Sequence, residues 1–215
     1  MIFNKVTFYN WCLIILILGC SLACISSKTN KSTGFSKFQA RKIMNAKSNM
    51  PMRVFKITNT ADSLLLRSKS AYVKPDSTDV VLNTFIKRLY ATVRDSISLG
   101  VGIAAPQVGV LKNVIWVQRF DKDEFPFEVY LNPKIISYSQ EKQTRKEGCL
   151  SIPNRTDVLN NRSKIVKIEY DKINGEHIIE TITDFTAIIF QHEIDHLNGI
   201  LYLDHLEKEI NDAKN

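Results

Sequence analysis

Apolar residues recur at steps of four between Asp79 and Leu99, which places them on one face of a helix. Ser77-Thr78-Asp79 precedes this stripe and offers side chains that cap helix N-termini. The pattern therefore predicts an amphipathic helix over residues 79–99. Its core-facing residues are expected to be Val81, Phe85, Leu89, Val93 and Ile97.

Runs rich in β-branched and aromatic residues follow, and they predict strands at 113–120 and 127–131. Residues 164–170 alternate between apolar and polar, as a half-buried strand does. A fourth run, 177–182, comes after Asn174-Gly175, a pair that favours hairpins because both turn positions accept a positive φ. The centre of the chain is thus expected to fold as antiparallel β-structure.

A second helix is predicted over the apolar run 185–197. Thr183-Asp184 can cap its start, and Asn198-Gly199 is typical of a helix end. The chain shows no internal repeats, and its order is helix, several strands, helix. This order predicts an α+β fold in which antiparallel strands pack around one long helix.

The first part of the chain, residues 1–25, holds a single charged residue, Lys5, and residues 11–25 are uncharged. The uncharged stretch is shorter than the roughly 20 apolar residues of a membrane-spanning helix, so it predicts an export signal. Ile17-Leu-Gly-Cys20 resembles a bacterial lipobox, which predicts a lipoprotein of the cell envelope anchored at Cys20. Cys24 is a second candidate for lipidation. The alternatives are an uncleaved membrane anchor and a cytoplasmic protein translated from a later start.

Residues 26–50 carry six basic side chains and no acidic one, and this composition predicts a flexible basic tether. Residues 51–215 are expected to form one globular domain, in which 22 basic residues balance 22 acidic ones. The net charge of +7 therefore comes from the first 50 residues. It favours an anionic membrane surface as a partner and gives no indication of nucleic-acid binding.

The segment His192-Glu193-Ile194-Asp195-His196 lies within the predicted second helix. Positions four apart share a helix face, so both imidazoles can reach one metal ion, and Glu193 is close enough to handle protons. Two surface histidines beside an acid are the plainer alternative. A catalytic ion of this class takes three protein ligands and leaves one position for water. Candidates for the third ligand are Cys149, His177, His205 and Asp204.

Two further segments carry candidate chemistry. Cys149 lies in Glu147-Gly-Cys-Leu-Ser-Ile-Pro153 and is the only cysteine after the leader, so no disulfide framework is possible there. Residues 100–109 are rich in glycine but lack the spacing and the lysine of a phosphate-binding loop. Their small side chains beside Gln107 suit a wall where the backbone meets a substrate.

Three motifs together resemble the signatures of the peptide deformylases. They are Gly100-x-Gly-x-Ala-Ala-Pro-Gln107, Glu147-Gly-Cys-Leu-Ser151 and Gln191-His-Glu-x-Asp-His196. All three are complete and stand in the order found in that family. The resemblance covers roughly residues 52–206, including the opening Arg53-Val-Phe-Lys-Ile57 and Leu66-Arg67.

The resemblance implies a hydrolase that removes the N-formyl group from N-formylmethionyl peptides or nascent polypeptides and releases formate, with residues 51–215 as its catalytic domain. The implied metal ligands are Cys149, His192 and His196. The family's ion is ferrous iron, for which zinc, nickel or cobalt can substitute, and a set of thiolate and imidazoles suits iron or zinc. An exported form is expected to favour zinc, because iron held by a thiolate is sensitive to oxidation.

The resemblance also implies roles for the residues around the metal. Glu193 would transfer protons, while the Gln107 side chain and the Leu150 backbone N–H would stabilise an oxyanion. Leu150 would also border the pocket for the methionine side chain, with ordinary core packing as the alternative for each apolar residue. The residues expected on the substrate side are Gly102, through backbone pairing, Ile103 and Ile189, in the methionine pocket, and Glu147.

Further charged residues are expected around this site. Glu147 is predicted to pair with Arg162, with a solvent-exposed ion pair as the alternative. Asp195 faces away from Glu193 on the helix and is expected to be structural. The spacing after Pro153 departs from the commonest family pattern, and Arg155 is the nearest candidate for the family's substrate-side arginine.

Two other functions compete with deformylation. An endopeptidase of the His-Glu-x-x-His class would need a third histidine or glutamate ligand downstream, and it would leave the Cys149 motif without a role. A lipoprotein that binds formyl peptides without turnover would not need Glu193 and Gln107. If the chain is exported, its expected substrates are secreted or degraded formyl peptides.

Overall fold

The computed structural model describes residues 34–95 and 99–214, which belong to one compact unit, Ser32–Asn215. The predicted leader, with the candidate lipidation sites Cys20 and Cys24, lies outside the described residues, as does the first part of the predicted tether. Among the residues that are described, no helix has both the length and the apolar character needed to cross a membrane.

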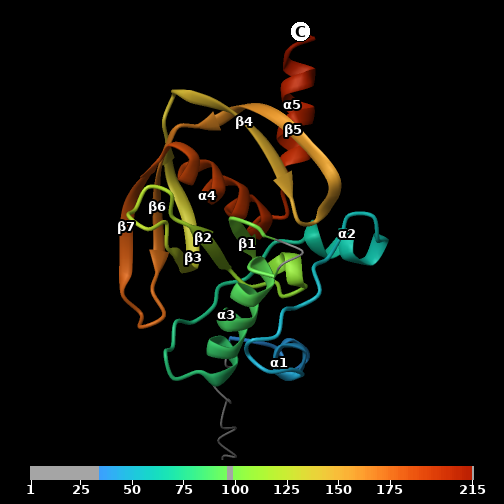
Figure 1. Ribbon diagram of the computed structural model, residues 1–215, viewed down its shortest axis with the longest axis vertical. Helices are drawn as coiled ribbons and strands as arrows, with labels where there is room; N and C mark the ends of the chain where they lie inside the picture. Colours follow the sequence, from blue (N-terminus) through green and yellow to red (C-terminus); the bar gives the residue numbers. More distant parts are fainter. Residues whose placement is uncertain (1–33, 96–98, 215) are drawn as a thin grey trace, which may run out of the picture. The chain divides into compact units, whose positions relative to one another are not determined.

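Five antiparallel strands form the main sheet, in the order β1-β2-β3-β6-β7 (Figure 1). All four predicted strands are present, and Gly175 in the hairpin turn takes a positive φ of 89°. The strand predicted over 127–131 corresponds to β3 and runs past residue 131. An irregularity between Leu131 and Lys134 lets it continue along β6. The strands are β1 (Gly102–Ala104), β2 (Val114–Gln118), β3 (Phe127–Tyr138), β6 (Ile165–Asp171) and β7 (His177–Thr183).

A two-stranded ribbon, β4 (Lys142–Cys149) and β5 (Ile152–Ser163), is a feature that the sequence pattern does not predict. Most β4 side chains are polar and exposed, so the segment lacks the apolar alternation of a half-buried strand. The ribbon arches over helix α4 (Asp184–Leu197), as Figure 1 shows. Cys149, at the end of β4, is thereby brought toward that helix.

Helix α4 lies between the main sheet and the ribbon, which confirms the α+β fold with strands around one long helix. Thr183 occupies the predicted N-cap position, although its side chain makes no capping hydrogen bond. Gly199 ends the segment with a φ of 74°, and a Cβ at this position would lie 2.4 Å from the Arg67 carbonyl oxygen. Helix and sheet share a core that includes Ile115, Tyr130, Ile168, Phe190 and Leu197.

Helix α3 (Val80–Val93) is shorter than the helix predicted over 79–99. Its start is as expected, because the Asp79 carboxylate accepts hydrogen bonds from the backbone N–H groups of Val81 and Leu82. At its end, the Gly100 N–H donates to the Val93 carbonyl at 3.0 Å, so the chain turns there to enter β1. Ile97, the last residue of the predicted stripe, lies outside the described residues.

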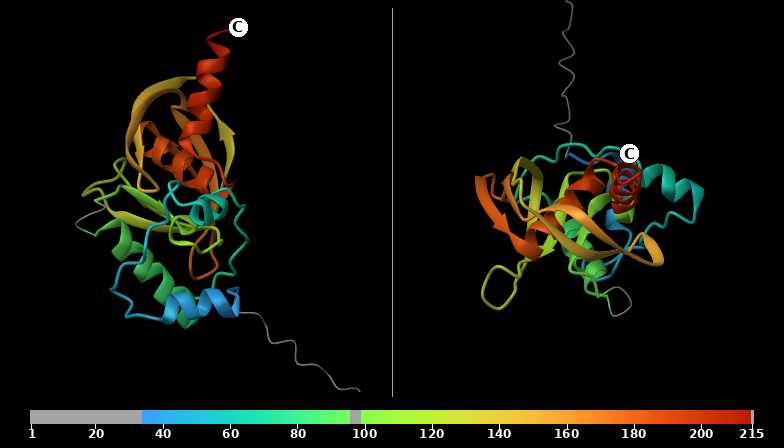
Figure 2. Two further views of the ribbon diagram at one scale, coloured as in Figure 1. Left: turned by 90° about the vertical axis from the view of Figure 1, so that its right-hand side faces the viewer. Right: turned by 90° about the horizontal axis from the view of Figure 1, so that it is seen from above.

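The tether predicted over 26–50 is wrong for its described part, because this part contains helix α1 (Lys37–Met44). Phe35 and Ile43 are buried in the same core as α3, and this apolar contact stabilises the segment despite its polar composition. The folded unit therefore begins before residue 51. Helices α2 (Thr60–Leu66) and α5 (Tyr202–Asp212) complete the unit, with α1 and α5 at opposite ends of it (Figure 2).

Candidate metal centre and active site

Cys149, His192 and His196 come together, with their potential ligand atoms all within 4.8 Å of one another. The Cys149 Sγ lies 3.2 Å from Nε2 of His196. The two histidines are four residues apart on α4, so their rings share one face, with centroids 5.0 Å apart. The structure thus assembles the three donors that the sequence resemblance implies.

The other candidates for a third ligand lie elsewhere. His177 is exposed, and its Nδ1 lies 2.8 Å from an oxygen of Asp171. His205 lies 2.8 Å from Asp195, and Asp204 binds Arg67 and the Leu201 N–H. The endopeptidase alternative required a histidine or glutamate in this position, and the structure supplies a cysteine instead.

Glu147 fixes the orientation of His192. Its Oε2 lies 2.9 Å from Nδ1 of His192, which leaves Nε2 of that ring free to face the cluster. Arg162 binds the same carboxylate through Nε at 2.7 Å and Nη2 at 3.0 Å. Burial alone would raise the pKa of Glu147, but the hydrogen bonds from His192 and Arg162 outweigh it and lower the pKa to about 2.

The Glu147–Arg162 pair is buried, with side chains 4% and 3% exposed, so the predicted pairing is present and the alternative of an exposed pair is wrong. Both oxygens of Glu147 are used by His192 and Arg162, so Glu147 borders the cavity without offering a free group to a substrate. Arg162 also binds Asp195 at 2.7 Å, and this contact places Asp195 in the supporting network, as expected.

Glu193 is 4% exposed, and its Oε2 is buried without a hydrogen-bond partner among the described residues. Burial raises the pKa of Glu193 to about 7, which outweighs the opposite effect of the two imidazoles. A buried, unpaired carboxylate oxygen is costly unless a further group completes it. The unpaired oxygen of Glu193 lies beside one cysteine sulfur and two imidazoles, and this combination fits a site that holds a divalent ion and a water.

The thiol of Cys149 is also adapted to a metal. Burial alone would raise its pKa, but the neighbouring His196 and His192 hold the pKa of Cys149 well below its usual range. Gly148 allows β4 to approach β5 closely before this residue, since a Cβ on Gly148 would lie 2.9 Å from Cγ2 of Thr156. The glycine of the motif therefore has a packing role next to the ligand.

Gln107 lies in the short 3₁₀ helix η1 (Ala105–Val108), which follows β1 directly. Its Oε1 accepts a hydrogen bond from the Ala104 N–H at 2.9 Å, which fixes the orientation of the amide. Its Nε2 then faces the cluster, 3.5 Å from the Cys149 Sγ and 3.3 Å from the Ser151 Oγ. Ser151 is a contact that the sequence analysis missed, although it closes the motif around Cys149.

A cavity of about 590 Å³ opens at this cluster. Gly102, Leu150 and Ile189 line it, as predicted. Ile103 is fully buried in the core with Leu89, so the prediction that it lines the methionine pocket is wrong and ordinary core packing is correct. Because side chains alternate along β1, Ile103 points to the opposite side from Gly102. Further lining residues not identified from the sequence include Lys56, Leu99, Val101, Lys146, Phe185 and Ile188.

Arg155 also lines the cavity, and its Nε lies 2.7 Å from Asp157. Lys56, on the N-terminal side, donates to the Leu150 carbonyl oxygen and so helps hold the backbone next to Cys149. Arg155, the candidate for the substrate-side arginine, therefore borders the cavity, whereas Lys56 is a position for which no role was predicted. Their place at the rim depends on contacts between distant segments.

The comparisons with known proteins agree with this geometry. A sequence profile described as Polypeptide deformylase matches residues 54–212. The peptide deformylase of Finegoldia magna is 36% identical over 155 residues, covering 72% of this chain and 90% of that protein. The peptide deformylase of a Caulobacter species is 37% identical over 157 residues, covering 73% and 88%.

Solved structures of the same kind are similar to this fold. A class I type b peptide deformylase from Acinetobacter baumannii, bound to Met-Ala-Ser, has a TM-score of 0.64 at 32% identity, covering 73% of this chain and 99% of that one. Peptide deformylase from Thermotoga maritima has a TM-score of 0.62 at 30% identity, covering 72% and 97%. With the profile match and these relatives, the chain belongs to the polypeptide deformylase family.

Proposed function

We propose that the Cys149–His192–His196 cluster, Glu193 and Gln107 carry out the reaction of this family in the present chain. As a family member, the chain is a metal-dependent hydrolase that removes the N-formyl group from N-formylmethionyl peptides and releases formate. The observation that best supports these residue roles is the placement of a buried, unpaired Glu193 oxygen beside the three-donor cluster.

The metal would be held by the Cys149 thiolate and one imidazole nitrogen each from His192 and His196. When bound, a divalent ion supplies Lewis-acid chemistry to the formyl oxygen and lowers the pKa of a nearby water. By resemblance to the family, the ion is ferrous iron, and zinc, nickel and cobalt are compatible with the same donors.

Glu193 would transfer the protons. With a pKa near 7, its carboxylate can take a proton from the attacking water and then deliver one to the leaving amine. Burial in the cavity wall also prevents bulk water from competing for that proton.

Gln107 and Leu150 would stabilise the negative charge on the formyl oxygen as the water adds. The Gln107 amide is oriented before the substrate arrives, through its hydrogen bond from Ala104. Leu150 directly follows Cys149, and its carbonyl oxygen accepts a hydrogen bond from Lys56. This contact helps to hold the backbone that carries the Leu150 N–H. Preorganised donors of this kind typically contribute about 3–4 kcal/mol each to transition-state stabilisation.

The substrate peptide would add to the free edge of β1. The Gln118 N–H of β2 donates to the Val101 carbonyl at 2.8 Å. Hydrogen bonding alternates along an antiparallel pair, so the backbone groups of Gly102 point away from β2 and toward the cavity side. A peptide strand pairing there would place its first side chain against Ile189, Leu150 and the newly identified Ile188 and Phe185.

The direct test is hydrolysis of formyl-Met-Ala-Ser by purified protein, with metal content measured on the same sample. Turnover that depends on about one equivalent of metal supports the proposal. Cleavage of casein without deformylation would instead support the endopeptidase alternative. Binding of the tripeptide without formate release would support a non-catalytic formyl-peptide receptor.

We further propose that the chain is exported and anchored in the cell envelope by a lipid on Cys20, and acts on secreted or degraded formyl peptides. The support is the uncharged run 11–25 and the lipobox-like Ile17-Leu-Gly-Cys20. Palmitate labelling of the wild type and of Cys20→Ala tests this proposal. Labelling that persists in Cys20→Ala would move the modification to Cys24 or another residue.

A further inference from the structure

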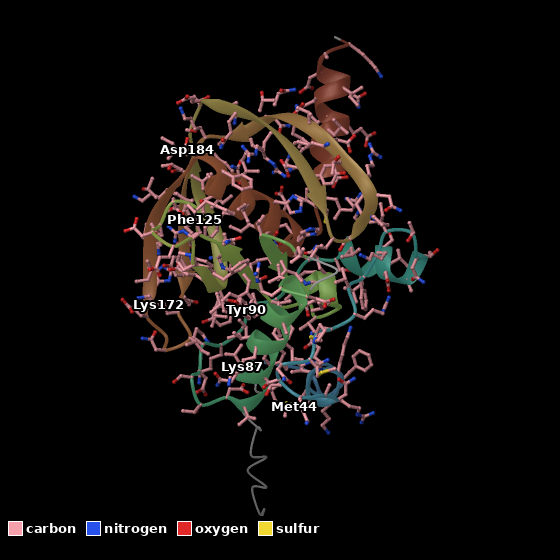
Figure 3. The ribbon with its side chains drawn as sticks, in the orientation of Figure 1. Met44, Lys87, Tyr90, Phe125, Lys172 and Asp184 are labelled. Carbon is pink, nitrogen blue, oxygen red and sulfur yellow. The ribbon has the colours of Figure 1, made fainter. Side chains whose placement is uncertain are left out.

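Helix α1 presents an outward face that mixes apolar and basic side chains. Phe38 is 73% exposed and Met44 is 47% exposed, and both belong to a helix whose Ile43 is buried in the core. Lys37 and Arg41 are also exposed. They lie on the same side of the helix as Met44, because residues 37, 41 and 44 follow the spacing of one helix face. Figure 3 shows Met44 at the end of the unit that α1 occupies.

The turn after α1 extends this surface. Met50 is 50% exposed and Lys47 is also exposed. The buried Arg88 of α3 ties the turn to the helix, since its guanidinium donates to the Ile43 and Met50 carbonyl oxygens at 2.8 and 3.0 Å. We define the α1 face as Lys37, Phe38, Arg41, Met44, Lys47 and Met50.

The α1 face is held in a fixed conformation. A capping box between Ser36 and Gln39 closes the first turn of the helix. Ile43, on the inward side, is fully buried, and the ring of Phe35 packs edge-on against Phe85 at 5.8 Å. The outward apolar side chains are therefore exposed by a rigid helix and not by a frayed end.

Helix α1 and the turn after it carry basic side chains and no acidic one. The first acidic residue of the whole chain is Asp62, and it is paired with Arg53. Lys87 of α3 adds a further exposed positive charge at the same end of the unit (Figure 3). Asp76 and Asp79, at the start of α3, accept hydrogen bonds from the Thr78 hydroxyl and from backbone N–H groups of the helix, and they keep their negative charges.

We propose that the α1 face docks on an anionic phospholipid surface. Exposed large apolar side chains among basic ones are the composition of helices that lie in a membrane interface. Along the sequence, eleven residues separate Ile25, at the end of the uncharged run, from Lys37, and this length spans at most roughly 40 Å when fully extended. Docking through α1 would not use the β4–β5 ribbon that borders the cavity, which lies at the other end of the unit (Figure 1).

The test uses the fragment 32–215, so that the leader cannot contribute to binding. This fragment is the compact unit with its own core, and relatives that match over 97% and 99% of their own lengths are solved as folded proteins. The measurement is co-sedimentation with phosphatidylcholine vesicles, with and without phosphatidylglycerol. We expect binding to the phosphatidylglycerol vesicles that weakens as salt is added, because salt screens exposed charges.

Lys37→Gln/Arg41→Gln should lower partitioning about 25-fold, since each basic residue at an anionic surface contributes about fivefold. The matched control is Lys69→Gln/Lys167→Gln, which removes the same charge from exposed positions elsewhere and should change partitioning little. Phe38→Ser/Met44→Ser should weaken the binding that persists at high salt. Unchanged hydrolysis of a soluble formyl tripeptide would show that each variant is folded.

Three results with vesicles would overturn the proposal. They are equal partitioning onto neutral and anionic vesicles, equal losses in the α1 and control variants, and no partitioning at low salt. A concentration-dependent dimer that Phe38→Ser/Met44→Ser abolishes would also overturn it, by assigning the face to a second copy of the chain. None of these readouts involves catalysis, so they are independent of the proposed deformylase mechanism.

Discussion

Oε2 of Glu147 lies 2.9 Å from Nδ1 of His192, and this contact links the metal cluster to a buried ionic network. The network continues from Glu147 to Arg162, then to Asp195 at 2.7 Å and to His205 at 2.8 Å. Because Asp195 lies on α4 between the two histidines, the network ties the ribbon to the helix at the level of the metal. The ligand geometry therefore depends on residues that never touch the ion.

Glu147→Gln tests this dependence. The amide keeps the shape of the side chain but removes the charge that orients His192 and neutralises Arg162. Loss of such a supporting group typically lowers metal affinity about 10–100-fold. Competition with a chelator, followed by metal analysis, measures the change. Glu141→Gln removes a carboxylate from an exposed pair with Lys164 and should leave affinity unchanged; similar values for the two variants would contradict the positioning role.

Glu193→Gln separates proton transfer from metal binding. The glutamine is nearly isosteric, and Glu193 is not a member of the ligand cluster, so the metal content should stay at the wild-type level. The rate of formyl-Met-Ala-Ser hydrolysis should fall by a factor of about 10²–10⁴, as expected when a general acid–base is removed. A fully loaded variant with the wild-type rate would show that another group moves the proton.

Gly102→Ala tests the close approach of β1 to the reacting groups. A Cβ at Gly102 would lie 2.5 Å from Oε1 of Glu193 and 2.8 Å from Cγ2 of Ile189, so one of these side chains must move. A displacement of about 1 Å at a catalytic group typically costs about 100-fold, and kcat/KM should fall by that order. Gly175→Ala is the control, because it strains a turn with a φ of 89° yet meets no atom within 4 Å. It should lower stability and leave kcat/KM unchanged.

The sequence could predict the parts of this site that depend on local spacing. The two histidines and Glu193 follow from a four-residue step on one apolar helix, and the hairpin at Gly175 follows from its own turn chemistry. The pairing of Cys149 with them does not follow locally. It depends on β4 and β5, whose polar side chains conceal the strands, and only the resemblance to a known family indicated it.

Two errors show what local patterns leave out. Ile103 and Ile189 are equally apolar, but the alternation of β1 turns the first into the core and the position of α4 turns the second into the cavity. Residues 34–50 have the composition of a tether, yet the burial of Phe35 and Ile43 and the hydrogen bonds from Arg88 hold them on α3. In both cases contacts between distant segments determine the structure, and composition does not reveal these contacts.

Asp62→Asn should change the pH dependence of stability. The Arg53 guanidinium, with Nη1 2.7 Å from Asp62 Oδ2, holds the pKa of that carboxyl below its ordinary value near 3.8. The folded state therefore binds fewer protons, and the pair's contribution is fully present above the unfolded pKa and lost as pH falls through the folded pKa. Because the Arg53 side chain is 63% exposed and solvent screens the pair, we expect a loss of at most about 1 kcal/mol at neutral pH.

Thermal unfolding from pH 7 down to pH 2 measures this difference. The wild type and Asp62→Asn should differ most at neutral pH and converge in acid. Asp212→Asn, which removes an exposed pair with Lys208 whose side chains are 70% and 63% exposed, should match the wild type throughout. A constant difference across the whole range would show that the Asp62 effect is not linked to its charge.

Cys149→Ala should remove the metal without unfolding the domain. Two imidazoles alone offer too few donors for a tight site, so the purified variant should contain far less than one equivalent of iron or zinc after dialysis. Its hydrolytic activity should fall to background for the same reason. Cys149 is a partly exposed residue at the rim of the cavity, so truncation should cost little stability compared with loss of a core side chain.

His177→Ala, which changes an exposed histidine outside the cluster, is the matched control and should retain both metal and activity. Full metal occupancy in Cys149→Ala would mean that the thiolate is not a ligand, and the proposed assignment of the site would have to be abandoned.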